Sequence, residues 1–308
     1  MSSKAAIAID IGATNTRIAL VDKAGRLIYR NQTNTIHSES NAEFVNFIKD
    51  FLNTSLSQNE IYNSCGIGVC VAGFVDTLRG TLIKSPNLPN KDLNIVEHLE
   101  GYFQKTVVLS NDTNAAILGE KLWGYGKNVR NFAFLTFSSG IGGRVFVNNK
   151  LVTDELGGSI EIGHIQIESN HNLTCGCGGI NHWESYASGI NMPKYLQAWS
   201  KEKKIKIDFN GKTIFTIFEA IDSGNKQANI FFDQVMKINL VGINYLINKF
   251  QSEVIILGGS VYLKHQDLFN KYLPQNPIFR SAFFGDNAPL IGSVSSLFSS
   301  KQTQIVLK

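Results

Sequence analysis

The chain has 308 residues, of which 43% are hydrophobic, and carries a formal net charge of +4 at pH 7. This length suggests two globular domains. The basic residues are scattered except for KEKKIK at 201–206, which we take as a solvated loop, so no nucleic-acid partner is expected. The best uncharged apolar run, CGIGVCVAGF, is about half a membrane span long, and the N-terminus lacks a signal-peptide pattern. We therefore expect a cytoplasmic protein without a membrane partner.

The first third of the chain alternates apolar runs with polar turns. Residues 5–30 predict a meander of three short strands, because GATNT and KAG separate the apolar runs. Residues 38–56 have apolar side chains at helical spacing after a Ser/Asn cluster that can cap a helix. GIGVCVAG at 66–73 predicts a buried strand that ends in a glycine, and KSPNLPN at 84–90 predicts a loop.

The remaining elements predict a mixed α/β protein with two related halves. A helix at 94–103 leads to the strand TVVLSND and a helix at 113–123, and residues 131–152 repeat the strand pattern of 5–30. A long helix at 229–250 precedes the strand 253–259, and PLIGSVSSLF predicts a short helix. We expect a smaller α/β domain at 1–113, completed by a C-terminal helix at 290–308, and a larger one at 114–289.

Ser110, Asn111 and Asp112 mark the change from an apolar strand to a helix. Open α/β sheets bind ligands at the carboxyl ends of their strands, and a carboxylate there can act as a general base. Asp is also a favoured residue at a helix N-cap, so Asp112 has a purely structural interpretation as well.

Two turns follow predicted strands and are rich in Gly, Ser and Thr. Such turns let backbone N–H groups approach a phosphate, although similar turns often only reverse the chain. Asp10 in the first turn is suited to a hydrated Mg²⁺. A third site, a glycine pair after VIIL, would let a nucleotide base or ribose pack closely. The candidate nucleotide-binding residues are Asp10, Gly12, Thr14, Asn15, Thr16, Thr136, Ser138, Gly140, Gly258 and Gly259.

The segments DIGATNTRIALVD, SNDTNAAILGE, TFSSGIGG and VIILGG resemble, in this order, the motifs of the sugar-kinase branch of the actin-like ATPase superfamily. EIGHIQIE followed by CGCGGINHWESYASG is similar to the signature of the ROK (repressor, open reading frame, kinase) family. The resemblance covers nearly the whole chain. It implies a two-domain actin-like (RNase H-like) α/β fold with the active site in the interdomain cleft. It also implies Mg²⁺ and ATP as cofactors and favours a homodimer.

The resemblance implies specific roles for single residues. Asp112 would accept the proton of the sugar 6-hydroxyl, and Asn111 would hold neighbouring hydroxyls. Gly73 lies where the chain can pass close to the sugar ring, and Asn87 has the position of a sugar-facing loop asparagine, although it is equally well explained as a turn residue. Glu161, His164 and Glu184 match the family's sugar-binding residues.

Two pairs of cysteines have different surroundings. Cys65 and Cys70 lie in an apolar run and are expected to be inert core thiols. The other pair contributes to a spacing H-x₁₀-C-x-C-x₄-H that suits a structural Zn²⁺ site, with His171 as a rival ligand and a metal-free loop as the alternative. In most of the family the fourth ligand is a cysteine. The predicted zinc ligands are His164, Cys175, Cys177 and His182.

Two further departures from the family pattern are Ile160 and Arg144, each at a position where the family usually has a glycine. The Arg144 guanidinium could reach nucleotide phosphate or point to solvent, and we expect it to point to solvent. The leading hypothesis is an ATP-dependent kinase acting on the 6-hydroxyl of a hexose or N-acylhexosamine, with glucose or N-acetylmannosamine as substrate. A sugar-responsive transcription regulator is the alternative, but the first strand begins by residue 5, which leaves no room for a preceding DNA-binding domain. A catalytically silent sugar-binding protein is the third hypothesis, although it would not need Asp112.

Overall fold

The computed structural model describes residues 5–152 and 161–299, and the chain divides into two compact units. The first unit extends to Asn128 and resumes at Ala282, and the second comprises Val129–Ser281. The chain therefore passes between the units twice. The boundaries expected from the sequence, after residues 113 and 289, both lie inside the first unit of this division. Ile160 and residues 300–308 of the expected C-terminal helix lie outside the described residues.

The first unit contains a five-stranded mixed sheet with the strand order β3-β2-β1-β4-β8. The first three strands form the predicted antiparallel meander, and β1, β4 and β8 are parallel neighbours. The five strands are β1 (Ala6–Ile11), β2 (Asn15–Val21), β3 (Leu27–Asn34), β4 (Ile67–Val71) and β8 (Val107–Asn111).

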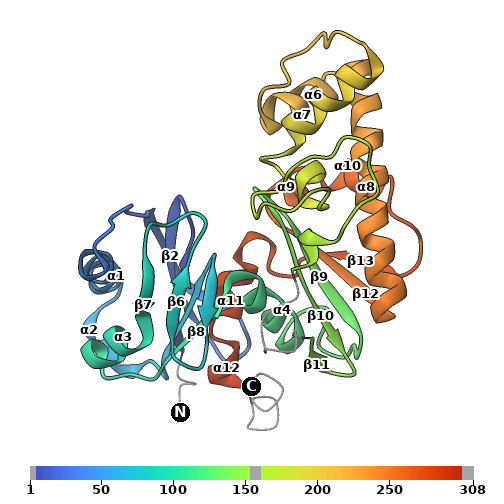
Figure 1. Ribbon diagram of the computed structural model, residues 1–308. Coiled ribbons are helices and arrows are strands. Elements are labelled where there is room, and N and C mark those ends of the chain that lie inside the picture. Colours follow the sequence, from blue (N-terminus) through green and yellow to red (C-terminus); the bar gives the residue numbers. More distant parts are fainter. Residues whose placement is uncertain (1–4, 153–160, 300–308) are drawn as a thin grey trace. The chain divides into compact units, whose positions relative to one another are not determined.

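Helices cover both faces of this sheet (Figure 1). Side chains alternate between the faces of a strand, so the isoleucines of β1 join the core beneath one set of helices and its alanines join the core beneath the other. The first set is α1 (Asn41–Ser55), α2 (Gln58–Asn63) and α3 (Ile95–Phe103); the second is α4 (Asp112–Leu122), α11 (Ala288–Gly292) and α12 (Ser295–Phe298).

Helices α4 and α11 approach each other closely through glycines. A Cβ atom added to Gly292 would lie 1.8 Å from the carbonyl oxygen of Ala115, and one added to Gly119 would lie 3.0 Å from the Cα of Gly292. A side chain at Gly292 would therefore separate the helices. This contact joins two segments distant in sequence and explains why α4 belongs to the first unit rather than beginning the second.

A small antiparallel sheet between β4 and α3 was not expected from the sequence. Its strands are too short and too exposed to give a clear alternating pattern. They are β5 (Phe74–Asp76), β6 (Thr81–Lys84) and β7 (Lys91–Asn94).

The sheet of the second unit has the order β11-β10-β9-β12-β13 and repeats the arrangement of the first. An antiparallel meander again leads to two parallel neighbours, so the similarity between residues 5–30 and 131–152 reflects a shared topology. The strands are β9 (Phe132–Phe137), β10 (Ile141–Val147), β11 (Lys150–Leu151), β12 (Val254–Gly258) and β13 (Ile278–Ser281).

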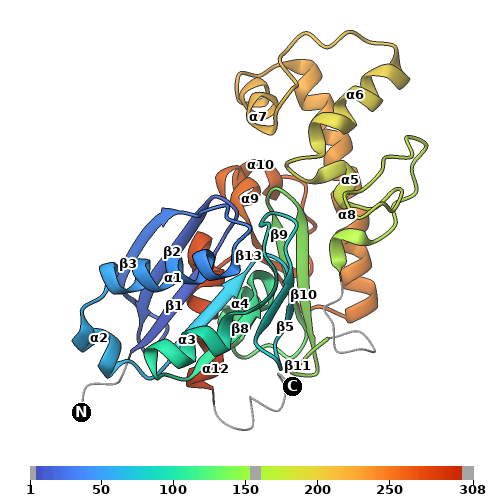
Figure 2. The same cartoon turned by 60° about the vertical axis from the view of Figure 1, so that its left-hand side comes forward.

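The long helix α8 (Lys226–Phe250) forms much of the core of the second unit. Its buried residues recur every three or four positions, and Trp183 packs where a side chain at Gly242 would otherwise lie. Figures 1 and 2 show α6 and α7 beside one end of this helix. The shorter helices are α5 (Glu184–Ala187), α6 (Met192–Lys203), α7 (Ile214–Asp222), α9 (Ser260–Lys264) and α10 (Gln266–Asn270).

Among the described residues, α8 is the one helix whose length and composition would suit a membrane span. The core helix of a globular unit passes the same test, and 44% of the most apolar window of α8 is buried. Because its apolar face packs into the core of the second unit, α8 is weak evidence for a membrane segment.

Candidate functional site

The first group of candidate residues lies at one edge of the first unit's sheet. The parallel strands β1, β4 and β8 end in register, because Ile11 pairs with Val71 and Val71 pairs with Asn111. The carboxyl ends of parallel strands meet at one edge of a sheet, which is where α/β proteins bind ligands. The turn that begins at Gly12 and the first residue of α4, Asp112, therefore lie at the same edge.

Asn111, rather than Asp112, is the N-cap of α4. The Asn111 side-chain oxygen accepts hydrogen bonds from the backbone N–H groups of Thr113 at 2.9 Å and Asn114 at 3.3 Å. Its amide nitrogen donates to the carbonyl oxygen of Gly73 at 2.9 Å, which ties the end of β8 to the turn after β4. The interpretation of Asp112 as the cap is therefore wrong, because its neighbour already fills that position.

Asp112 is the first residue of α4 and is partly exposed. Its Oδ1 atom accepts a hydrogen bond from the backbone N–H of Thr113 at 2.7 Å and lies 3.3 Å from the Thr113 hydroxyl. A carboxylate at the first turn of a helix is stabilised by the positive end of the helix dipole. The side chain is thus held in place at the strand end without serving as the cap.

The β1–β2 turn is stabilised by a threonine that sequence reasoning missed. The backbone N–H of Gly12 donates to the carbonyl oxygen of Asn15 at 3.0 Å, which closes the turn. Thr35 donates from its hydroxyl to the carbonyl oxygen of Gly12 at 2.8 Å, and its backbone N–H donates to that of Thr14 at 2.9 Å. Thr14 is exposed, whereas Thr16 is fully buried with its hydroxyl 2.9 Å from that of Thr35. The structure therefore places Thr16 beneath the turn.

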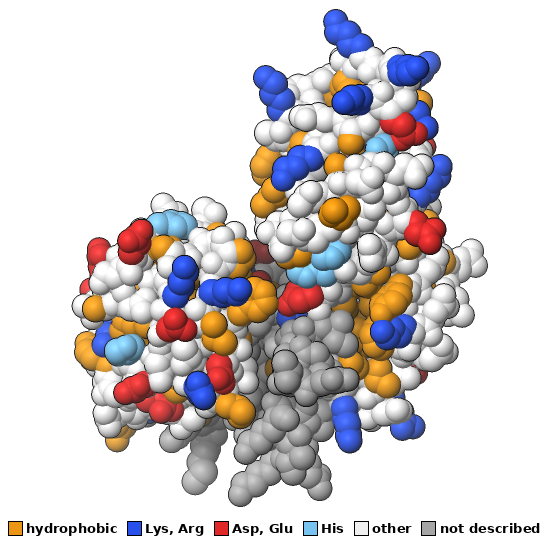
Figure 3. Space-filling view, in the orientation of Figure 1, with side chains coloured by type: hydrophobic (Ala, Val, Ile, Leu, Met, Phe, Trp, Pro, Cys, Tyr) orange, Lys and Arg blue, Asp and Glu red, His pale blue; other side chains and the backbone are white. Residues whose placement is uncertain are grey.

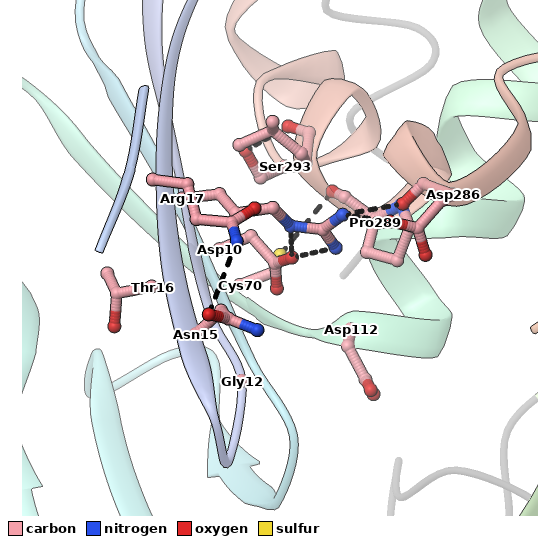
Figure 4. A network of polar contacts seen from close by, with 12 residues as sticks. Asp10, Gly12, Asn15, Thr16, Arg17, Cys70, Asp112, Asp286, Pro289 and Ser293 are labelled. Carbon is pink, nitrogen blue, oxygen red and sulfur yellow. Dashed lines mark hydrogen bonds and ion pairs between the residues drawn. The ribbon is translucent and has the colours of Figure 1, made fainter. Parts of the chain in front are cut away.

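Asp10 lies on β1 directly opposite Arg17 on β2, and it is 5% exposed. The Arg17 guanidinium donates from Nε to the Asp10 Oδ2 atom at 2.8 Å and also contacts that oxygen through Nη2. Its Nη1 atom donates to the carboxylate of Asp286 at 2.6 Å and to the Asp286 carbonyl at 3.0 Å. The thiol of Cys70 donates to the Asp10 Oδ1 atom at 3.3 Å. Figure 4 shows this network, with Asp112 nearby but outside it.

The charges in this network shift two pKa values. Burial lowers the pKa of Arg17, but the charges of Asp10 and Asp286 outweigh it, so that pKa is raised above its ordinary value. Burial, followed by the negative charge of Asp10, raises the pKa of Cys70 well above its ordinary value. The buried Cys70 thiol is therefore neutral and unreactive, as expected, but it also contacts Asp10.

Gly73 and Asn87 lie on neighbouring turns of the first unit. A Cβ atom at Gly73 would lie 2.7 Å from the Lys84 carbonyl oxygen, so only glycine fits there. Ser85 donates from its hydroxyl to the Ala72 carbonyl at 2.7 Å and accepts from the Asn87 backbone N–H at 3.1 Å. Asn87 is exposed at the β6–β7 loop. Ser85, which sequence reasoning missed, thus joins the two turns.

The second group of candidate residues surrounds the β9–β10 turn of the second unit. Thr136 pairs with Gly258 on β12, and a Cβ atom at Gly259 would lie 2.4 Å from the Thr136 hydroxyl. Gly259 also has a φ of 86°, which favours glycine. The hydroxyls of Ser138 and Ser260 lie 3.0 Å apart. The structure therefore brings together the glycine pair and the second Gly/Ser turn, as the nucleotide-site hypothesis requires.

Glu184 lies at the same turn. Its Oε2 atom accepts a hydrogen bond from the backbone N–H of Ile141 at 2.9 Å, and a Cβ atom at Gly140 would lie 2.5 Å from that oxygen. Gly140 is therefore required for the carboxylate to reach the turn. The structure joins a predicted sugar-binding residue to a predicted nucleotide-binding turn.

Glu161 directly precedes a 3-10 turn, η1 (Ile162–His164), and His164 is its last residue. Glu161 is exposed, and one of its carboxylate oxygens lies 4.0 Å from the guanidinium of Arg144. The Arg144 side chain is only 4% exposed, and it donates to the Gly143 carbonyl at 2.6 Å. The expectation that Arg144 points to solvent is therefore wrong. Its side chain folds inward and places a positive charge beneath Glu161.

The four predicted zinc ligands converge. One ligand atom from each of the four side chains lies within 4.8 Å of every other, and the set comprises His164, Cys175, Cys177 and His182. The Cys177 sulfur is 3.2 Å from the His182 Nδ1 atom, and the two imidazole rings stack at 4.9 Å. The rival His171 lies outside this cluster, with its Nε2 atom 3.0 Å from a carboxylate oxygen of Glu202.

Burial and the neighbouring His164 lower the pKa of His182, against the opposing effect of Glu184. Burial is also the largest cause of the raised pKa of Cys175. The histidine is therefore held in the neutral form that binds metals, whereas the cysteine would lose its proton on metal binding. Two thiols and two imidazoles form a donor set suited to Zn²⁺.

Basic side chains gather at one end of the second unit. In Figure 3 they lie over the region of α6 and α7, and on the visible face of the first unit they alternate with acidic side chains. The group expected from KEKKIK forms the end of α6 and the following loop, and its lysines are exposed, as predicted.

Several contacts of the site were missed because they join segments distant in sequence. Arg17 is the exception, because its position opposite Asp10 follows from the register of the predicted hairpin. Asp286 and Thr35 gave no comparable signal. Both reach the β1–β2 region only through the folded chain.

Comparisons with known proteins match nearly the whole chain. The model of the ROK family matches residues 6–299. A glucokinase from Pyrobaculum calidifontis is 30% identical over 96% of this chain and 96% of its own length. A xylose repressor from Bacillus spizizenii is 32% identical over 86% of this chain but 66% of its own length. The crystal structure of a ROK family glucokinase from Streptomyces griseus, in complex with glucose and AMPPNP, superposes with a TM-score of 0.73 at 26% identity, covering 94% of this chain and 97% of that one.

Proposed function

We propose that this protein, which belongs to the ROK family, is an ATP-dependent kinase that phosphorylates the 6-hydroxyl of a hexose or N-acylhexosamine. Its fold is the actin-like ATPase fold of that family, with two related α/β units. The single observation that carries the proposal is the position of Asp112, at the carboxyl end of β8 and on the same sheet edge as the β1–β2 turn. A base beside a phosphate-binding turn is what transfer to a hydroxyl requires.

In the proposed reaction Asp112 accepts the proton of the attacking sugar hydroxyl. The Thr113 backbone N–H, which donates to the Oδ1 atom at 2.7 Å, orients the carboxylate. Asn111 fixes the strand end by capping α4 and by holding the Gly73 carbonyl. A sugar hydroxyl would therefore meet a base whose position is set before substrate binds.

The β1–β2 turn and Asp10 are proposed to bind the phosphates and Mg²⁺. Both oxygens of Asp10 already have protein partners, Arg17 and Cys70, and the side chain is 5% exposed. A carboxylate so enclosed fits contact with a hydrated Mg²⁺ through the metal's water molecules. When bound, Mg²⁺ would neutralise phosphate charge. In the second unit the Ser138 turn and Gly259 are proposed to bind the nucleotide.

The sugar is proposed to contact Glu161, His164, Glu184 and Asn87, with glucose and N-acetylmannosamine as the leading candidates. Carboxylates and imidazoles that are fixed by neighbours discriminate between sugars, because a missing hydroxyl leaves a polar group unpaired. Glu184 is fixed by the Ile141 backbone N–H, and Arg144 lies beneath Glu161. These contacts support the proposed sugar-binding role.

A structural Zn²⁺ is proposed at the Cys/His cluster. Its ligand atoms lie within 4.8 Å of one another, whereas ligand atoms around tetrahedral zinc are separated by about 3.3–3.8 Å, as expected from zinc–ligand bonds of roughly 2.0–2.3 Å. Only small side-chain movements would close the site. The metal would brace the loop that presents Glu184.

We further propose that the protein acts in the cytoplasm as a homodimer, with sugar and ATP as its small-molecule partners and no membrane or nucleic-acid partner. A sugar-responsive regulator is the alternative, since the xylose repressor is also a relative. The chain spans 96% of the length of the Pyrobaculum calidifontis glucokinase and 66% of the length of that repressor.

The proposal is tested by ADP release with Mg²⁺-ATP across glucose, mannose, fructose, N-acetylglucosamine and N-acetylmannosamine. We expect turnover with at least one of these sugars. Asp112→Asn should retain sugar binding, measured by calorimetry, while kcat falls by about 10²–10⁴-fold, the range typical of a lost general base. Turnover with none of the five sugars would reject the kinase assignment. Unchanged turnover in the variant would reject the role of Asp112.

A further inference from the structure

Glu120 is a fully buried carboxylate on α4 that the proposed reaction does not use. Its Oε1 atom accepts a hydrogen bond from the backbone N–H of Phe283 at 2.7 Å, and its Oε2 atom accepts one from the backbone N–H of Tyr125 at 3.0 Å. The segment of Tyr125 leads to the chain crossing after Asn128, and the segment of Phe283 follows the crossing before Ala282. One side chain therefore holds both connections between the two units.

Backbone hydrogen bonds hold the segment of Tyr125 to the end of α4, and a ring contact joins it to the segment of Phe283. The backbone N–H groups of Gly124 and Gly126 both donate to the carbonyl oxygen of Glu120, each at 3.1 Å. The rings of Tyr125 and Phe283 meet edge to face with centroids 5.5 Å apart. The carboxylate thus lies at the junction of the two segments, and each of its oxygens serves a different one.

Gly124 provides the space that the carboxylate needs. A Cβ atom at this position would lie 2.1 Å from the Glu120 Oε2 atom and 2.8 Å from its Cδ. An alanine there would displace the end of the Glu120 side chain from Tyr125, because the far end of a side chain moves more easily than backbone. The position of the Glu120 carboxylate therefore depends on a glycine at position 124.

We propose that Glu120 is a positioning residue that fixes both chain connections between the two units to the first unit. The connecting segments then pivot only beyond Tyr125 and before Phe283, which limits how the units move during a catalytic cycle. Hinges of this kind are short stretches at the ends of elements, and changing them alters kcat and KM together. The kinetic part of this inference rests on the proposed kinase function. The structural part does not.

The test is hydrogen exchange of the full-length protein at pH 8, comparing wild type, Glu120→Gln and Gly124→Ala. Glutamine keeps the size of the side chain, but its amide NH₂ group would face the backbone N–H of either Tyr125 or Phe283. One hydrogen bond is therefore lost, and the remaining one is weakened. We expect exchange to rise at least threefold in peptides covering both 124–128 and 282–286, with the sheet peptides unchanged. Gly124→Ala should reproduce the effect with Glu120 still present.

Glu100→Gln is the matched control, because Glu100 also accepts a backbone N–H bond within the first unit, from Val107 at 2.9 Å, away from both connections. It should leave exchange in both connecting segments unchanged. Faster exchange in only one segment, or uniformly across the first unit, would overturn the proposal. In the kinase assay Glu120→Gln should lower kcat/KM for the sugar about tenfold. If wild type has no kinase activity, the exchange result still decides the structural proposal.

Discussion

At the scale of single residues, the helix cap and the proposed general base are two adjacent side chains. Asn111 caps α4 and holds the Gly73 carbonyl, so Asp112 is not needed as the cap. An N-cap contributes about 1 kcal/mol to stability, so the strand end is stabilised independently of the proposed base. A substitution of Asp112 is therefore expected to affect turnover more than folding.

Arg17 is a second residue whose effect on the proposed reaction can be measured apart from folding. Arg17→Lys keeps the charge but cannot present the two donors that contact the Asp10 Oδ2 atom. We expect the KM for Mg²⁺-ATP to rise about tenfold while the KM for the sugar changes less than threefold, measured as initial rates at saturating co-substrate.

Asp286→Asn provides the control for this prediction. The Asp286 side chain is 69% exposed, and exposed ion pairs contribute little. This variant should change the KM for Mg²⁺-ATP less than threefold. An equal effect of both variants would show that Arg17 acts through the C-terminal segment rather than through Asp10.

At the scale of elements, the loop between η1 and α5 is expected to depend on the proposed zinc ion. Cys177→Ser removes one of the four converging ligands and should abolish the bound zinc, which we expect at about one ion per chain in wild type. Sugar affinity should fall at least tenfold because the loop no longer presents Glu184. Metal content is measured by atomic emission spectroscopy after dialysis.

His171→Ala is the control for the zinc prediction, because His171 pairs with Glu202 and lies outside the cluster. It should retain the full zinc content. Zinc retained by Cys177→Ser, or lost from His171→Ala, would show that the ligand set has been assigned incorrectly.

The expected elements agree with the structure where the apolar pattern is strong. The strands of both meanders, the helices α1, α3 and α8, and the strand before Asp112 all lie close to their predicted positions. The small sheet formed by β5, β6 and β7 was missed, because a strand of three or four residues with at most one buried side chain leaves no periodic signal. Helix α2 was missed for the same reason, since it has a single buried residue.

At the scale of the whole molecule, Glu120 makes stability depend on pH. Burial raises its pKa from 4.5 to about 7, against the opposing effect of three backbone hydrogen bonds. The folded protein therefore binds this proton more tightly than the unfolded chain does. The contribution of Glu120 to the free energy of unfolding is greatest below about pH 4.5 and decreases as the pH rises towards 7. The decrease is at most roughly 1.4 kcal/mol per pH unit.

We expect the thermal midpoint of wild type, relative to that of Glu120→Gln, to fall between pH 5 and pH 7.5, because glutamine does not titrate. Calorimetry at three pH values within this window checks the difference. A difference that stays constant across the window would contradict the raised pKa. The comparison with the variant removes the contributions of other titrating groups.

The two repeated meanders, the strand end at Asp112, the Cys/His spacing and the family could be predicted from the sequence, because each depends on local periodicity or on residues close together in the chain. The residue that caps α4, the inward direction of Arg144, and the contacts that Arg17, Asp286 and Glu120 make with distant segments were found in the folded structure alone. Such contacts depend on how elements pack, and a hydrogen bond between residues 120 and 283 leaves no pattern at either position. Short-range patterns of residues can be predicted from a sequence, whereas the partners of a buried charged group depend on the tertiary packing around it.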